Sequence, residues 1–172
     1  ILWNHGWEYD KNPELFFNTL FKLKDMGADF NLIVLGESFS KYPEIFNIAK
    51  NRLKDHIIHF GFCDSFEDYA NWVWRSDIIP VTSNQDFFGI SVVEAVYCNV
   101  RPLLPNRLAY PEVFKIRENP DIFYNGEKEL LDKLFYTIML EAESRRLKDN
   151  DYRLIQENRA ANIKFWPRFI KL

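Results

Sequence analysis

The stretch that decides the fold is residues 82–99, which read TSNQDFFGISVVEAVYCN. An apolar run of strand length ends just before it at Val81, a polar loop follows, and a helix is predicted from about Gly89 to Cys98. Asn99 tolerates the left-handed conformation that often ends a helix. In a parallel α/β sheet, this order of strand, loop and helix places the start of the helix at the carboxyl edge of the sheet.

Apolar runs of strand length recur on both sides of this stretch, with amphipathic segments between them. This alternation is typical of a parallel sheet covered by helices, so we predict an α/β fold with one doubly wound, Rossmann-like sheet of about six strands. The runs are short and unbroken, as expected for strands covered on both faces. The predicted strands are residues 1–3, 30–35, 57–60, 78–81, 102–104 and 122–124.

Signals for the ends of helices stand between several of these runs. Asn12 offers a capping side chain directly before a proline, and Gly27 is placed to end the helix that follows. Ser65, with Asp68 three residues later, is a variant of the capping box and predicts another helix start. These signals support helices between the strands.

The last third of the chain is predicted to form carboxyl-terminal helices, one over residues 127–146 and another from about residue 151 to Trp166. We find no internal repeat or linker, so residues 1–172 are interpreted as a single domain. The chain opens at Ile1, inside a predicted buried strand and not at a methionine. We therefore expect it to be a piece of a longer polypeptide.

Composition limits the classes of function. Apolar residues make up 47% of the chain, enough for one core, and the net charge of −3 provides no general basic surface for a polyanion. No apolar run approaches the roughly 20 residues that span a bilayer, and no signal-peptide pattern opens the chain, so we expect no membrane partner. Cys63 and Cys98 lack the spacing of a metal or redox motif, and two thiols favour a reducing cytoplasmic location.

The predicted helix start at Gly89 has the chemistry of an anion site. The backbone N–H groups of Gly89, Ile90 and Ser91 are expected to be free and to point to solvent, and Gly89 lets a phosphate approach closely. Asp86 precedes the helix and Glu94 lies about a turn and a half inside it. Their carboxylates can accept hydrogen bonds from sugar hydroxyls. A nucleotide-diphospho-sugar combines both kinds of group.

These residues also resemble a known family. Asp86 and Glu94 are separated by seven residues, with Phe88 and Gly89 between them. This pattern resembles the acidic-x7-Glu signature of retaining glycosyltransferases with the GT-B fold, in their carboxyl-terminal, donor-binding domain. Residues 57–61, IIHFG, are similar to the strand that lines the nucleotide base pocket in that family.

Two stretches are more particular. Residues 4–14, NHGWEYDKNPE, and residues 94–98, EAVYC, are similar to the tRNA-queuosine mannosyltransferase group. This resemblance implies a retaining glycosyltransferase that needs no metal or other cofactor and transfers mannose from GDP-mannose to queuosine in tRNA. It also implies an amino-terminal acceptor domain in the same polypeptide, through which the full-length enzyme would contact tRNA. The fragment alone would bind donor without transferring sugar.

The resemblance assigns roles to single residues. Among the catalytic positions, Lys11 would neutralise the donor diphosphate, Glu94 would hold the ribose, and Asp86 would orient the sugar. The other donor-binding positions are Gly61 and Phe62 near the base, Phe87 and Phe88 at the sugar, and Gly89, Ile90 and Ser91 at the diphosphate.

Two positions depart from the family pattern. Asp86 stands where the family usually has a glutamate, which is one methylene longer. Gly6, also at the donor site, stands where this group normally has an arginine that stabilises the leaving diphosphate, and a glycine carries no charge. Two alternatives therefore stay open: a degenerate nucleotide-binding or interaction domain without catalysis, and a sugar-nucleotide epimerase of the same fold.

Other conspicuous residues are interpreted as structural. His5, His56 and His59 have no spacing that indicates a metal site, so no metal is expected. The aromatic-rich segments 15–21 and 69–74 are interpreted as core and inter-helix packing.

Overall fold

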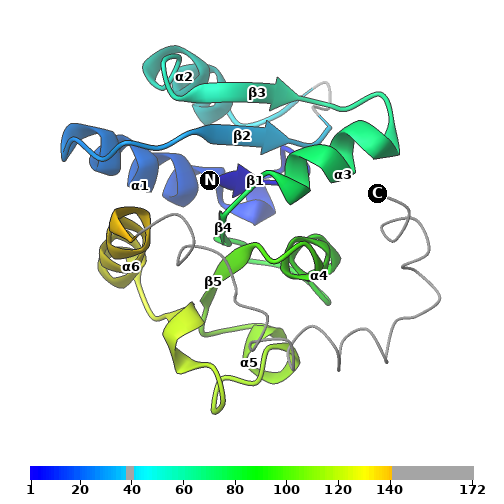
Figure 1. The fold of residues 1–172 in the computed structure, drawn as a ribbon, viewed down its shortest axis with the longest axis vertical. Helices are drawn as coiled ribbons and strands as arrows, with labels where there is room; N and C mark the ends of the chain where they lie inside the picture. Colours follow the sequence, from blue (N-terminus) through cyan, green and yellow to red (C-terminus); the bar gives the residue numbers. More distant parts are fainter. Residues whose placement is uncertain (38–40, 141–172) are drawn as a thin grey trace.

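The computed structural model describes residues 1–37 and 41–140. Within these ranges the predicted α/β alternation is confirmed, with helices on both sides of parallel strands (Figure 1). The elements are β1 (Leu2–Trp3), η1 (Tyr9–Lys11), α1 (Pro13–Asp25), β2 (Leu32–Leu35), α2 (Ile45–Arg52), β3 (Ile57–Gly61), α3 (Phe66–Trp74), β4 (Ile78–Pro80), α4 (Ile90–Tyr97), β5 (Arg101–Pro105), α5 (Tyr110–Val113), η2 (Pro120–Ile122), β6 (Phe123–Tyr124) and α6 (Glu127–Met139), where η marks a 3₁₀ helix.

The predicted helix over residues 127–146 is present as α6, which ends at Met139. The rest of that prediction lies outside the described residues. So does the whole of the helix predicted from about residue 151 to Trp166.

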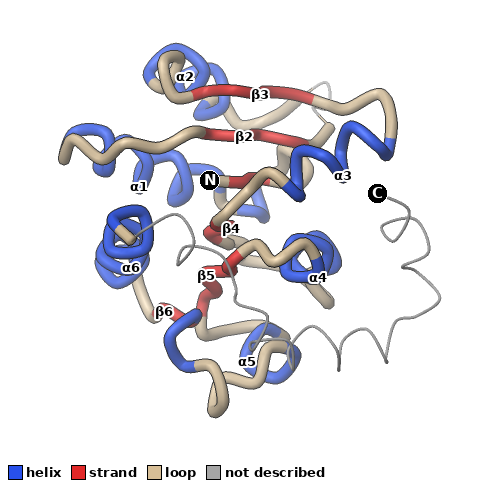
Figure 2. The backbone as a smooth tube through the Cα atoms, in the orientation of Figure 1, coloured by secondary structure: helices blue, strands red, loops and turns tan. Residues whose placement is uncertain are grey.

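The single six-stranded sheet is not confirmed, because the strands divide into two parallel sheets of three. Their hydrogen-bonded orders are β1-β2-β3 and β4-β5-β6. β1 lies against β4, so the six strands follow one another in space in the order 3-2-1-4-5-6 that is found in Rossmann-type folds (Figure 2). β1 has only two residues, and Pro80 in β4 has no N–H to donate, so this junction offers few groups for a hydrogen-bonded ladder.

Each strand except β3 contributes to two hydrophobic cores, one on either side of the strands. Leu2 belongs to one core and its neighbour Trp3 to the other, and Ile33 and Val34 in β2 divide in the same way. Because successive side chains of a strand point to opposite faces, this division means that both faces of the strands are covered. The expectation of a doubly wound arrangement is met on this point.

The helix starts of α1 and α3 carry the predicted caps. The Asn12 side chain accepts a hydrogen bond from the Leu15 amide at 3.3 Å, and the Ser65 hydroxyl accepts one from the Asp68 amide at 3.0 Å. α4 differs: it begins after Gly89, at φ 72°, without a side-chain cap from that residue. Its other end is followed by Asn99 at φ 63°, as predicted.

The loop after β1 is held tightly over the end of β2. The Trp7 ring stacks on Phe46 with centroids 4.4 Å apart, and its Nε1 donates to the Leu35 carbonyl at 3.3 Å. Gly36 lies so close that an added Cβ would stand 2.1 Å from the His5 carbonyl oxygen. Only a glycine allows this approach, so the position of the loop depends on Gly36.

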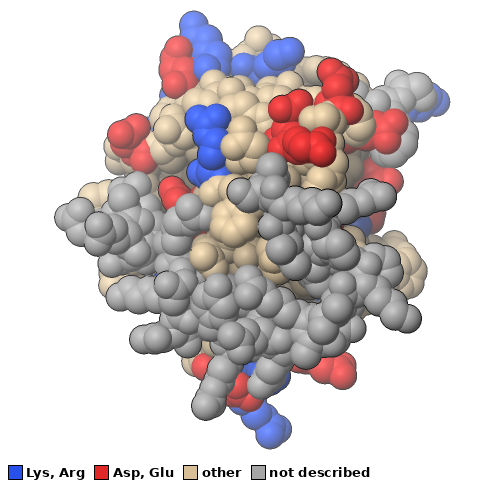
Figure 3. All heavy atoms as spheres, turned by 45° about the vertical axis from the view of Figure 1, so that its right-hand side comes forward, with Lys and Arg blue, Asp and Glu red and all other residues tan. Residues whose placement is uncertain are grey.

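The charged side chains form no broad basic surface on the face drawn in Figure 3, as far as the described residues cover it. Acidic and basic groups are interspersed there, in keeping with the net charge of −3. None of the helices in the described ranges is long and apolar enough to cross a membrane.

Candidate functional site

The predicted site residues meet at the carboxyl ends of the strands. The strands β1, β2 and β3 run in one direction, so the loops that follow them lie at one edge (Figure 1). A cavity of about 600 Å³ opens between the loop after β1 and the loop after β4. It is lined by Glu8, Asp10, Lys11, Gln85, Asp86, Phe87, Phe88, Gly89 and Ile90.

The start of α4 is partly closed by Asp86, which corrects one expectation. The Gly89 amide, expected to be free, donates to Asp86 Oδ1 at 2.8 Å. The other carboxylate oxygen of Asp86 accepts a hydrogen bond from the Tyr110 hydroxyl at 3.0 Å. Within the described part of the chain, the amides of Ile90 and Ser91 have no acceptor, so these two remain available to an anion.

Gly89 is required at this helix start for two reasons. Its φ of 72° lies in the left-handed region that favours glycine, and a Cβ there would stand 2.8 Å from Cε1 of Tyr110, a buried ring. Because Tyr110 packs so closely, the backbone of the helix start is accessible only if residue 89 has no side chain.

Lys11 reaches the cavity but already has partners. Its Nζ donates to the Gln85 carbonyl at 3.1 Å and forms an ion pair with Asp10 at 3.1 Å. Its side chain is 18% exposed, so the ammonium is held in one place instead of ranging through solvent. The same two loops are joined a second time, because the Asn84 amide donates to the Asp10 carbonyl at 2.7 Å.

Arg107, which we did not predict, fixes the loop after β4 from the other side. Its guanidinium donates to the carbonyls of Thr82 and Ser83 and to Oδ1 of Asn84 at 2.9–3.2 Å. A guanidinium occupied in this way supports the shape of the loop and does not supply a free cation to the cavity.

Glu94 is linked to Asn4 through Tyr69. Its Oε2 accepts a hydrogen bond from the Tyr69 hydroxyl at 2.7 Å, and that hydroxyl accepts one from Asn4 Nδ2 at 3.3 Å. Burial raises the pKa of the Glu94 carboxyl, while the hydrogen bond from Tyr69 lowers it. Burial, together with the charge of Glu94, raises the pKa of Tyr69 well above its usual range, so its phenol keeps its proton.

Asn4 and His5, which directly follow β1, hold the first turn of α4. Asn4 Nδ2 donates to the Ser91 carbonyl at 2.9 Å, and the Ser91 hydroxyl hydrogen-bonds His5 Nδ1 at 3.0 Å. Burial lowers the pKa of His5 to about 4, so the ring is neutral at pH 7. Neither residue was predicted as part of the site, although two polar residues directly after a buried strand are a usable signal.

Of the two residues predicted near the base, Phe62 lines a second cavity of about 310 Å³ and Gly61 does not. Gly61 ends β3 with φ 138°, and the next residue, Phe62, is 64% exposed at the mouth of this cavity. Tyr69, on α3, lines the same cavity. Tyr69 therefore connects this cavity to Glu94, although Glu94 itself lines neither cavity.

Gly6 provides no charge where the family pattern has an arginine. Its backbone is not in the left-handed region, and an added Cβ would come nearest to Glu8 Oε2, at 3.2 Å. The three atoms nearest to this added Cβ all belong to the side chain of Glu8.

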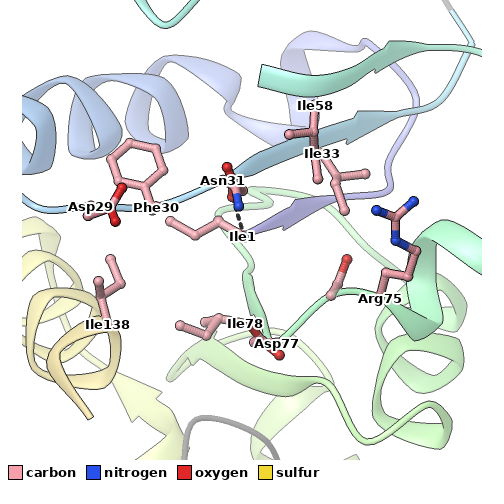
Figure 4. A pocket seen from close by; sticks show the side chains of 11 residues that line it. Ile1, Asp29, Phe30, Asn31, Ile33, Ile58, Arg75, Asp77, Ile78 and Ile138 are labelled. Atoms are coloured by element: carbon pink, nitrogen blue, oxygen red, sulfur yellow. Dashed lines mark hydrogen bonds between the residues drawn. The ribbon is translucent and has the colours of Figure 1, made fainter. Parts of the chain in front are cut away.

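A third cavity, of about 260 Å³, lies at the opposite ends of the strands (Figure 4). Its lining includes Ile33 from one sheet and Ile78 from the other, together with Arg75. None of the residues predicted to bind a donor lines it. The predicted site therefore belongs to the carboxyl edge alone.

Fold and site together define a class of protein: an α/β domain, covered on both faces, with a helix start that has two unpaired amides in the described structure at the carboxyl edge of its strands. Residues 5–153 match the family described as "Glycosyl transferases group 1". The chain belongs to this family and is a glycosyltransferase domain.

Individual proteins that are similar to this chain are glycosyltransferases as well. The chain is 30% identical, over all 172 residues, to the tRNA-queuosine alpha-mannosyltransferase of Drosophila melanogaster, and it spans 44% of the length of that relative. Among solved structures, it resembles the carboxyl-terminal domain of a glycosyl transferase group 1 family protein from Francisella tularensis. That match has a TM-score of 0.71 at 20% identity and covers 89% of this chain and 82% of the other.

A glycosyltransferase from Rickettsia africae is similar as well, with a TM-score of 0.66 at 18% identity over 98% of this chain and 47% of the other. At these identities the structural matches establish the fold, which is that of GT-B glycosyltransferase domains. The resemblance stated from the sequence is thereby confirmed at the level of family and fold.

Proposed function

We propose that the chain is the donor-binding domain of a retaining, metal-independent glycosyltransferase that uses a nucleotide-diphospho-sugar. The observation that carries the proposal is one cavity in which Lys11 and the open start of α4 stand beside Asp86. A diphosphate suits the first two groups, and a sugar offers hydroxyls to the third. No metal ion is part of the proposal, and the described residues contain no group of three or more His, Cys, Asp or Glu side chains that could hold one.

The finer proposal is that the donor is GDP-mannose and the acceptor is queuosine in tRNA. It is supported by the identity of 30% with a relative whose name states tRNA-queuosine mannosyl transfer. Transfer would break the bond between the sugar carbon and the diphosphate while an acceptor hydroxyl attacks from the same face. Lys11 and the amides of Ile90 and Ser91 would stabilise the negative charge that grows on the leaving diphosphate.

The acceptor would be held by an amino-terminal domain of the same polypeptide, working in the cytoplasm. Support for this division comes from the lengths, because the chain spans 44% of its Drosophila relative. This chain alone is then expected to bind donor without transferring sugar.

A second candidate, a nucleotide-binding or interaction domain without catalysis, is favoured by the charges in the cavity. Glu8, Asp10 and Asp86 contribute three carboxylates, against the single ammonium of Lys11 among the described lining residues. Asp10 is also paired with that ammonium. With Gly6 in place of arginine, a diphosphate meets less positive charge than the reaction needs.

Calorimetry with GDP-mannose, GDP and UDP-glucose tests the first proposal directly. Binding of GDP-mannose and GDP in preference to UDP-glucose is the expected result. If none of the three binds to the full chain, the donor-binding role is wrong.

Replacing Gly6 with arginine separates the two candidates. A guanidinium in this position adds charge-assisted hydrogen bonds to a diphosphate, so Gly6→Arg should bind GDP about tenfold more tightly than the wild type. Gly6→Gln, which is long and polar but uncharged, is the matched control and should give no such gain. If the wild type and both variants all fail to bind nucleotide, the interaction domain is the better description.

A further inference from the structure

We infer that Tyr69 is a positioning residue for nucleotide recognition, because its hydroxyl fixes the Glu94 carboxylate against the ribose while its ring forms a wall of the cavity beside Phe62. The inference deepens the proposed function and rests on it, since it requires a nucleotide at the carboxyl edge.

The hydrogen bonds around the Tyr69 hydroxyl have a defined direction. Asn4 Nδ2 is a donor only, so the hydroxyl oxygen must accept from it, at 3.3 Å. The single phenol proton is then free for Glu94 Oε2, which lies 2.7 Å away. The three side chains of Asn4, Tyr69 and Glu94 therefore form a chain of hydrogen bonds with a single possible direction. This chain holds Oε2 in place.

One oxygen of Glu94 is left for a ligand. No described residue donates to Oε1, and no lysine or arginine of the described residues forms an ion pair with this carboxylate. An ionised carboxylate has about four positions at which it can accept a hydrogen bond, and Tyr69 takes one of them. The remaining positions suit the two hydroxyls of a ribose.

The location of Tyr69 fits the position of a ribose in a nucleotide. A ribose connects the base to the phosphates. Tyr69 and Phe62 line the cavity at the end of β3. The hydrogen-bond partner of Tyr69, Glu94, is on α4, and Ile90, the first residue of α4, lines the cavity of Lys11. A nucleotide with its base in the cavity of Phe62 and its diphosphate in the cavity of Lys11 would have its ribose between them, on the side of this pair.

The hydrogen bond from Tyr69 also favours the ionised form of Glu94. Burial raises the pKa of the Glu94 carboxyl, and the hydrogen bond from Tyr69 acts in the opposite direction. The other titratable groups nearby are Cys98, which directly follows α4 and acts on Tyr69, and His5, which contacts Ser91. Neither is a cation at pH 7, so the Tyr69 phenol is the group that stabilises the charged carboxylate.

The experiment compares the full chain with its Tyr69→Phe variant, which loses one oxygen atom and keeps the ring. Binding of GDP and of 2′,3′-dideoxy-GDP is measured for both. The wild type should prefer GDP about tenfold, and Tyr69→Phe should reduce this ratio to about threefold or less, because Glu94 is no longer held. The control is Tyr124→Phe, which removes another buried phenol, one that donates to the Val81 carbonyl at 2.6 Å, and should leave the ratio unchanged.

A second measurement needs no ligand. Carboxyl ¹³C NMR should find a higher pKa for Glu94 in Tyr69→Phe than in the wild type or in Tyr124→Phe. In addition, Tyr69→Phe made in a Glu94→Gln background should have little further effect on GDP affinity, because the two residues act as a unit.

The outcomes separate this inference from the proposed function. If the wild type prefers GDP but Tyr69→Phe changes neither the ratio nor the Glu94 pKa, the role of Tyr69 is wrong and the donor site stands. If the Glu94 pKa moves as expected but no nucleotide binds to the wild type, the proposed function is wrong, and the recognition role of Tyr69 fails with it.

Discussion

The starts of α1 and α3 differ from the start of α4. Asn12 and Ser65 each cap their helix with a side chain that accepts an amide hydrogen bond two or three residues into it. At α4, Asp86 accepts only the amide of Gly89 and leaves those of Ile90 and Ser91 without an acceptor in the described structure. We call the first two starts closed, because the side chain of the N-cap residue caps an amide inside the helix, and the third open, because Gly89 provides no such cap.

The open start is held by groups outside the helix instead. His5 and Asn4 fix Ser91, Tyr69 fixes Glu94, and Tyr110 packs against Gly89. Support of this kind leaves the first turn rigid without using its amides, which is what binding an anion at a helix start requires. Three predictions test the contrast between closed and open helix starts.

The largest effect is expected for Gly89→Ala. The change combines left-handed strain with a Cβ 2.8 Å from the buried Tyr110 ring, so it should cost about 3 kcal/mol of stability and abolish detectable GDP binding. Gly27→Ala is a matched control, with φ 78° but nothing within 4 Å of the new Cβ, and should cost only about 1 kcal/mol. Urea denaturation measures both. Equal losses would mean that Tyr110 does not constrain the helix start.

An intermediate effect is expected from acid, through His5. The unfolded chain protonates this histidine as the pH falls below about 6.5, whereas the folded chain, with a His5 pKa of about 4, does not. His5 therefore contributes its full stability above pH 6.5 and loses it as the pH falls toward 4, at a cost of about 2 kcal/mol by pH 5. Denaturation of the wild type and His5→Asn at pH 7 and pH 5 isolates this contribution. The same pH dependence in both proteins would exclude His5 as its source.

The smallest effect is expected at a closed start. Ser65→Ala removes the cap of α3 and should cost about 1 kcal/mol of stability. Ser65 also lines the cavity of Phe62, but its hydroxyl already donates to the Asp68 carboxylate and accepts from the Asp68 amide, so GDP affinity should stay within twofold of the wild type. Thermal melts and calorimetry on one preparation check both values. A tenfold loss of affinity at constant stability would show that the start of α3 also belongs to the site.

Much of the fold followed from local patterns. The apolar runs located the strands because buried parallel strands are nearly continuous hydrophobic segments, and Asn12 and Ser65 marked helix starts because capping is a local interaction. The division into two sheets was not predictable in this way. It depends on β1 lying against β4 without a hydrogen-bonded ladder, and that contact joins segments far apart in the chain.

The sequence predicted residues of the candidate site but not the partners that they contact. The spacing of Asp86, Gly89 and Glu94 marked the helix start, and Lys11 was placed beside it by the resemblance. The partners of these residues come from other elements: Tyr69 from α3, Tyr110 from α5 and Asn4 from the end of β1. Tyr69 was interpreted as packing, because a partly buried tyrosine gives no sign in the sequence of where its hydroxyl points.

The stacking of Trp7 on Phe46 gives the protein a built-in optical reporter. Trp7 follows Gly6 and precedes Glu8, and its indole is 7% exposed, with its N–H bound to the Leu35 carbonyl. Indole emission depends on the polarity and rigidity around the ring. Any ligand that shifts the loop after β1 thus changes the environment of a chromophore already in place, and occupancy can be followed by fluorescence without attaching a dye.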